Sequence, residues 1–226
     1  MRKIRVSFFM LAFLLVLSAC QKEETPVVAE QEATVEQKTQ EPELEITAET
    51  LNTLESNFYN ISDVQVVDFM LPDGKTEQRY QVEDDITFSV ESPQALPEVK
   101  KGSDAERNYH TNNLVSPRTL TIIGFTGRGS NGLSSNEQTA LQWAVNNYNR
   151  LNLSISFSLT FGTDYENKDM VVYYNPNESG SGGSAGFPSS GNPNKFVQIY
   201  GLDNSSVDVI EHVITHEMGH SVGFRH

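Results

Sequence analysis

Three histidines and one glutamate lie close together in residues 216–226, which read HEMGHSVGFRH. His216 and His220 are four residues apart, so in an α-helix their imidazoles share one face and can bind the same metal ion. Glu217 lies beside that face, where its carboxylate can accept a proton from water without being a metal ligand. These residue types in this order indicate hydrolytic chemistry at a metal ion.

A third ligand follows from the chain's next turn. Gly223 comes three residues after the second histidine and can adopt a positive φ, which would end the helix and turn the chain back. That return brings His226 toward the ion. Three protein ligands leave a fourth position for water, as in a catalytic zinc site, whereas a structural zinc has four protein ligands. We therefore expect Zn²⁺ bound by His216, His220 and His226.

Two further histidines are weaker candidates. His212 precedes His216 by four residues, but three histidines stacked along two turns would point away from a single tetrahedral ion. It also falls in the narrow polar sector of an otherwise apolar helix. His110 lies in a polar segment remote from the motif. We expect neither of them to be a ligand.

The whole string fits the pattern H-E-x-x-H-x-x-G-x-x-H of the metzincin zinc proteases at every defined position. Together with Gly-Gly-Ser-Ala-Gly-Phe-Pro at 182–188, it resembles the bacterial dual-action HEIGH metallopeptidase family over roughly residues 118–226. The resemblance implies a zinc-dependent endopeptidase acting on protein or peptide substrates. Glu217 would then be the general base that activates water and returns the proton to the leaving amine.

Upstream patterns predict the elements that would position this site. Ser134 and Glu137 form a capping box for a helix with an apolar stripe, and Ser205 or Ser206 can cap the helix that carries the histidines. Apolar or alternating runs predict strands at 120–125, 153–161, 170–174 and 196–200. This order resembles a zincin N-terminal subdomain. We expect an α+β fold, a twisted mixed sheet with two main helices, preceded by a small hairpin-containing module.

Residues 182–187 are the predicted substrate-binding segment. In the zincin architecture an extended substrate pairs antiparallel with an exposed edge strand, for which residues 182–188 and 196–200 are the candidates. Small side chains let a peptide backbone approach closely. A flexible surface loop is the alternative. The resemblance favours the cleft, formed by Gly182, Gly183, Ser184, Ala185, Gly186 and Phe187.

Residues 46–96 are predicted to form the small hairpin-containing module. Thr47 can cap a short helix, and Pro72-Asp73-Gly74-Lys75 is a turn between two strands, with a third strand at 86–90. Val-Glu-Asp-Asp at 82–85 resembles the VEGD-like segment that precedes the protease domain in the family, which implies a prosegment, although Asp84 replaces the glycine. The residues themselves indicate no latency, because no single acidic residue can be chosen as a blocking group. Residues 97–117 read as a linker.

The N-terminus has the features of a bacterial lipoprotein. Basic residues precede an apolar run at 6–17, too short to span a bilayer. Leu-Ser-Ala-Cys at 17–20 resembles a lipobox, so we expect a signal peptide at 1–19 and lipid on Cys20, the only cysteine. Residues 20–45 lack aromatic residues and apolar periodicity, which predicts a disordered acidic tether. The expected location is the bacterial cell envelope, lipid-anchored and extracytoplasmic.

The charge of the chain excludes some partners. The net charge is −14, and loss of the three basic residues in the signal peptide leaves 13 basic against 30 acidic residues. We therefore expect no nucleic acid partner and no membrane contact except through the lipid. The composition indicates nothing about oligomeric state.

No methionine follows Met218, whereas metzincins continue past the third histidine into a subdomain with a methionine-containing turn. We therefore expect residues 118–226 to be a metallopeptidase domain that is incomplete at its C-terminus. The alternative function is a catalytically inactive or truncated surface lipoprotein that acts as a binding module. A zincin that cleaves only its own prosegment is a third possibility. Casein cleavage that a chelator abolishes would distinguish an active protease from a binding module.

Overall fold

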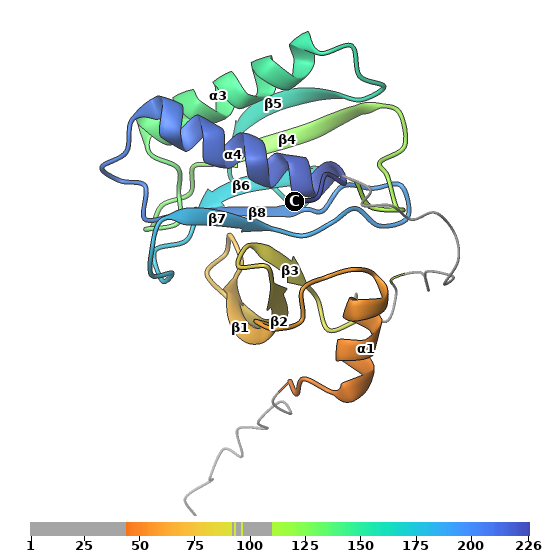
Figure 1. Ribbon diagram of the computed structural model, residues 1–226. Helices are drawn as coiled ribbons and strands as arrows, with labels where there is room; N and C mark the ends of the chain where they lie inside the picture. Colours follow the sequence, from red (N-terminus) through yellow and green to blue (C-terminus); the bar gives the residue numbers. More distant parts are fainter. Residues whose placement is uncertain (1–43, 92, 94–95, 97–109) are drawn as a thin grey trace, which may run out of the picture. The chain divides into compact units, whose positions relative to one another are not determined.

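The computed structural model describes residues 44–91, 93, 96 and 110–226 (Figure 1). The predicted signal peptide, Cys20, nearly all of the tether and most of the linker lie outside these residues. Within the described part, none of the helices combines the length and the apolar character that a membrane span requires.

A mixed sheet runs through the described residues, with eight strands in the order β1-β2-β3-β7-β8-β6-β4-β5. The strands are β1 (Gln65–Met70), β2 (Thr76–Val82), β3 (Ile86–Phe88), β4 (Thr119–Phe125), β5 (Ser156–Gly162), β6 (Met170–Tyr174), β7 (Gly182–Ala185) and β8 (Phe196–Tyr200). The helices in the described residues are α1 (Ala48–Ser56), α3 (Ser135–Arg150) and α4 (Val207–Val222). The predicted α+β class is confirmed.

The N-terminal elements form as their sequence signals predict. The Thr47 hydroxyl accepts a hydrogen bond from the Thr50 N–H and so caps α1. Strands β1 and β2 pair antiparallel on either side of the predicted turn, and β3 pairs antiparallel with β2. Strand β3 also pairs in parallel with β7, at Ile86 and Ala185. The strands predicted within residues 46–96 therefore continue the sheet formed by the later strands.

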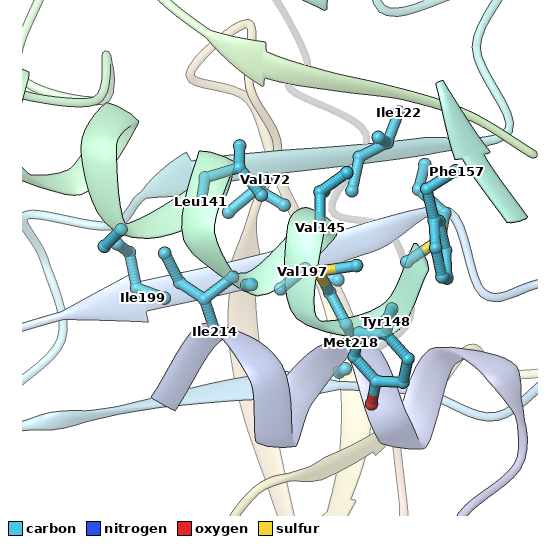
Figure 2. Packing of buried hydrophobic residues seen from close by; sticks show 14 of the residues in the cluster. Ile122, Leu141, Val145, Tyr148, Phe157, Val172, Val197, Ile199, Ile214 and Met218 are labelled. Carbon is cyan, nitrogen blue, oxygen red and sulfur yellow. The ribbon is translucent and has the colours of Figure 1, made fainter. Parts of the chain in front are cut away.

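The helices α3 and α4 lie over the same face of the sheet (Figure 1). Both predicted caps form, with Ser134 and Glu137 as a reciprocal capping box on α3 and Ser206 capping α4. The buried stripe of α3 and the apolar face of α4 meet the side chains of the strands in one core (Figure 2). This core includes Ile122, Leu141, Val145, Tyr148, Phe157, Val172, Val197, Ile199, Ile214 and Met218.

Strand β5 is shorter than its residue pattern predicts. The alternation begins at Leu153, but pairing with β4 begins at Ser156. Because β5 is the last strand of the sheet, only β4 supports it. Leu153 and Phe161 are each 41% exposed. The apolar alternation therefore extends beyond the residues that the core covers.

A buried polar network connects β1 to the centre of the sheet. The Tyr173 hydroxyl and the Gln198 Nε2 both donate to the Met70 carbonyl, at 2.6 Å each. The Gln198 Oε1 accepts from the Asn175 Nδ2 at 3.0 Å. Gln198 and Asn175 are each 1% exposed. Because a buried polar group left unpaired is costly, this network stabilises the contact between the end of β1 and strands β6 and β8.

Candidate metal centre

Helix α4 places His216 and His220 one turn apart on the same face. Their Nε2 atoms are 3.0 Å apart. His220 is buried, with 3% of its side chain exposed, whereas 40% of the His216 side chain is exposed. Met218 points to the other side and is fully buried in the core. The helix is thus anchored by its apolar face while it presents both imidazoles at the opposite side.

The C-terminal end of α4 brings in the third histidine. Gly223 has φ 115°, and its N–H donates to the carbonyls of Gly219 and His220, which ends the helix as the sequence predicts. The chain then turns back, and the His226 Nε2 lies 3.2 Å from the His216 Nε2. The structure therefore brings all three predicted ligands together.

Arg225 anchors this returning segment to the N-terminal elements. Its guanidinium donates to the carbonyls of Asn57 and Phe58, at 2.9 and 3.0 Å. It also lies over the ring of Tyr59, 4.4 Å from the ring centroid, a geometry typical of a cation–π contact. Hydrogen bonds and a ring contact with the loop that follows α1 thus fix the residue before His226.

Hydrogen bonding fixes which nitrogen of His220 is available. Its Nδ1 lies 2.8 Å from the carbonyl oxygen of Phe224. Since a carbonyl can only accept, the proton is assigned to Nδ1, and Nε2 keeps its lone pair for a metal ion. On His226, Nδ1 lies 3.5 Å from the carboxylate Oε2 of Glu83. Two of the three imidazoles therefore have a partner that orients Nε2 toward the centre.

A fourth group, Asp85, joins the three histidines. Its Oδ2 lies 3.1 Å from the Nε2 of His216, 3.6 Å from that of His220 and 3.3 Å from that of His226. The four potential ligand atoms all lie within 4.8 Å of one another. Burial alone would raise the pKa of Asp85, but when no metal is bound and the surrounding histidines are protonated, their hydrogen bonds and positive charge hold that pKa well below its usual range.

Sequence reasoning missed Asp85. It lies 131 residues from His216 in the chain, and it is one of 30 acidic residues. The only signal was the VEGD-like resemblance of residues 82–85, which marked the segment without selecting a residue. The position of Asp85 depends on the pairing of β3 with β7, and neither short strand has a pattern that predicts this pairing.

The donor set fits a divalent metal ion. Imidazole nitrogens and a carboxylate oxygen are typical zinc ligands. The second oxygen of Asp85, Oδ1, is buried and has no hydrogen-bond partner among the described residues. Four lone-pair atoms that converge in a partly buried site repel one another unless protons or a cation lie between them. A cation at this point would satisfy all four.

Glu217 is buried beside this cluster. The residue is 2% exposed, and its Oε2 has no hydrogen-bond partner among the described residues. Burial and the negative charge of Asp85 raise the pKa of Glu217 well above its usual value. A buried carboxylate without a partner is costly for stability, so its presence beside three convergent imidazoles indicates a functional role.

The predicted substrate-binding residues lie beside Glu217 and the histidines, but in an unexpected environment. Strand β7 lies between β8 and β3 in the sheet instead of at a free edge. Residues 183–187 are buried, and Gly182 is partly exposed. Phe187 contacts His220, Tyr59 and Phe88 through its ring. The segment therefore borders the site while β3 covers part of its outer edge.

The two weaker histidine candidates lie outside the cluster. His212 is exposed on α4, as its polar sector predicts. His110 forms an isolated bridge with Phe224, and its Nδ1 contacts the Thr111 carbonyl at 2.9 Å. Neither residue belongs to the group of potential ligands among the described residues.

Three convergent histidines beside a buried glutamate, on an α+β sheet, are the features of a metal-dependent hydrolase. The family model described as dual-action HEIGH metallo-peptidase matches residues 80–226, roughly two thirds of the chain. The chain belongs to this family and is a metallopeptidase. The matched range begins at residue 80 and therefore includes Asp85 as well as the three histidines. None of the curated proteins matches the sequence.

Proposed function

We propose that the protein is a zinc-dependent endopeptidase in which His216, His220 and His226 bind the metal ion and Glu217 is the general base. The observation that carries this proposal is the buried, unpartnered carboxylate of Glu217 beside three imidazoles whose Nε2 atoms converge. The alternative, an inactive binding module, would give these groups no role, and membership of a peptidase family argues against it.

Zinc is the metal that the donor set favours, because three imidazoles are a common ligand set of catalytic zinc sites. When bound, zinc would lower the pKa of a coordinated water and polarise a peptide carbonyl. The protonated Nδ1 of His220 keeps its Nε2 available to the metal, and the Phe224 carbonyl holds the ring in orientation.

Glu217 would move the proton. Its raised pKa makes the carboxylate a stronger base than an exposed glutamate, so it can take a proton from the attacking water. The same property favours the protonated carboxyl after this transfer, so that Glu217 can then donate the proton to the leaving amine. The buried setting strengthens these interactions, since little water is present to screen them.

The backbone of residues 182–187 would bind the substrate as an extended strand. This segment borders Glu217, and its small side chains would let a second backbone approach the edge that β3 covers in this structure. The substrates of this family are proteins or peptides, and we assign the extended-strand mode to this chain. We further propose, from the sequence alone, an exported protein anchored through lipid on Cys20, with the peptidase domain outside the cytoplasm.

The test compares proteolysis with metal content. Casein hydrolysis is measured for the protein and for its Asp85→Ala variant, which lacks the carboxylate that lies against all three histidines. Each protein is assayed with and without phenanthroline, which removes the metal ion. We expect metal-dependent cleavage, and we expect Glu217→Ala in the same background to retain its zinc while losing at least about 100-fold in turnover. Cleavage by the Glu217→Ala variant at the parent rate, with equal zinc content, would refute the role of Glu217.

A further inference from the structure

Residues 83–85, the turn between β2 and β3, are held against the metal centre by two carboxylates. The Asp85 Oδ2 contacts the Nε2 atoms of all three histidines. The Glu83 carboxylate accepts a hydrogen bond from the Asn60 N–H at 2.9 Å and lies 3.5 Å from the His226 Nδ1. One short turn therefore supplies a potential ligand to the site and a partner to one of its histidines.

The backbone of the same segment occupies the edge of β7. The Ala185 N–H donates to the Asp85 carbonyl at 3.0 Å. A methyl group on Gly186 would lie 2.7 Å from the Thr87 carbonyl oxygen, so the close approach of β3 requires a residue without a side chain there. The glycine at position 186 therefore allows β3 to lie this close to the segment that follows β7.

The direction of β3 distinguishes it from a substrate. Strand β3 runs parallel to β7, whereas a substrate is expected to run antiparallel to this strand. A segment that runs in the opposite direction to a substrate has the order of carbonyl and N–H in each of its peptide bonds reversed relative to the substrate. It can therefore cover the substrate edge without being positioned for cleavage.

Apolar packing keeps the segment in place. Val82 and Ile86 are fully buried, and Phe88 is 4% exposed. They form one cluster with Leu54, Tyr59 and Phe187, the last of which also contacts the ring of His220. Withdrawal of β3 would expose this cluster to water, so the covered arrangement is favoured until something removes the segment.

We propose that Asp85 is a removable fourth ligand of the metal ion, and that the turn at 83–85 and β3 keep the peptidase latent by closing both the metal and the substrate edge of β7. The proposal rests on the proposed function for the activity that is suppressed. Four protein ligands leave no position for water, as in a structural site. Withdrawal of the turn would open the fourth position and free the edge of β7 in one movement.

The test uses a small metal-binding probe instead of catalysis. The full chain is loaded with Co²⁺, and acetohydroxamate binding is followed by the visible absorption of the metal. We expect the Asp85→Ala variant to bind the probe about 100-fold more tightly than the parent protein, because a site that is closed 99% of the time loses that factor in apparent affinity. Asp84→Asn is the matched control. Asp84 is the neighbouring acidic residue and lies outside the ligand group. Asparagine tolerates the positive φ of residue 84, so the variant should keep the turn. We expect it to behave like the parent.

Equal probe affinity in the parent and the Asp85→Ala variant would overturn the proposal. Loss of metal from the folded Asp85→Ala variant would also overturn it, because Asp85 would then be a permanent ligand. Circular dichroism checks folding, and Asp85→Asn, which keeps the side-chain shape, replaces the alanine variant if that one does not fold. An Asp85 variant that binds metal and probe but cleaves no peptide would instead contradict the endopeptidase function and leave the closure intact.

Discussion

At the scale of single residues, the position of Glu217 depends on the absence of a side chain at Gly183. A methyl group at residue 183 would lie 2.5 Å from the Cγ of Glu217 and 2.8 Å from the Gln198 carbonyl oxygen. Both distances are too short for a carbon contact. The glycine of β7 therefore gives the glutamate the space in which it lies beside the histidines.

We expect Gly183→Ala to displace the Glu217 carboxylate and to lower turnover by about 100-fold, because an error of about 1 Å in a catalytic group can cost that factor. Zinc content should stay unchanged, since no ligand is altered. Both quantities are measured in the Asp85→Ala background. Gly182→Ala serves for comparison, since its methyl group would meet nothing closer than 3.7 Å. Equal turnover in the two alanine variants would contradict this account.

Two exposed histidines of the C-terminal segment, His226 and His212, give a second residue-scale prediction. His226→Ala removes a proposed ligand, so the affinity for zinc should fall by more than the roughly 10- to 100-fold that loss of a supporting partner typically costs. His212→Ala removes an exposed imidazole of the same helix, outside the ligand group, and should leave the affinity unchanged. Competition with a chromophoric chelator measures the zinc affinity of both variants. Equal affinities would show that His226 is not a ligand.

At the scale of elements, α3 holds α4 through Tyr148. The Tyr148 hydroxyl donates to the Thr215 carbonyl at 2.9 Å, one residue before the first histidine. The ring packs against Phe157, with centroids 5.4 Å apart, and Figure 2 shows it among the residues of the shared core. Burial raises the pKa of Tyr148 to about 12. The contact between the helices thus combines apolar packing with this hydrogen bond and with one from the Asn147 Nδ2 to the Glu211 Oε1 at 2.7 Å.

Tyr148→Phe should lower the free energy of unfolding by about 1 kcal/mol at neutral pH, because it removes one hydrogen bond and keeps the ring. The raised pKa means that the neutral phenol stabilises the folded state fully below pH 10, and that this contribution is lost as the pH rises toward about 12. Denaturant unfolding of both proteins across this range measures the effect. A difference that does not change with pH would show that Tyr148 does not titrate as the structure implies.

The helices and the short strands differ in how well the sequence predicts them. Helix α4 could be predicted to its ends, because Ser206, the apolar positions and Gly223 are all local signals within one segment. Strand β7 could not, because Gly-Gly-Ser-Ala has no apolar pattern and its place depends on partners far away in the chain. For the same reason the sequence identified three histidines within eleven residues but did not identify Asp85, whose position requires the assembled sheet.

At the scale of the whole described molecule, the sheet connects the early and the late strands. The register of β3 with β7 is short, but the Met70 carbonyl also accepts from Tyr173 and Gln198. We therefore expect the described parts of the chain, residues 44–91 and 110–226, to unfold in one cooperative transition. Trp143, the only tryptophan, lies on α3 and reports on the later elements, whereas circular dichroism reports on all of them. Separate midpoints from the two signals would contradict a single unit.

Gln198→Leu tests the same connection directly. It leaves the Asn175 amide without its buried acceptor and removes one of the two donors to the Met70 carbonyl. We expect the free energy of unfolding to fall by roughly 2 kcal/mol. Both signals should shift together. A shift confined to circular dichroism would show that the early strands unfold independently.

The order of Asp85 and the histidines along the chain has a consequence for biosynthesis. A ribosome makes the aspartate 131 residues before His216, and chains begin to fold from their N-terminal parts. The carboxylate is therefore already present when the last helix emerges and its imidazoles first converge. Under the proposed closure, a newly made molecule that folds in this order has no interval in which its metal site is uncovered.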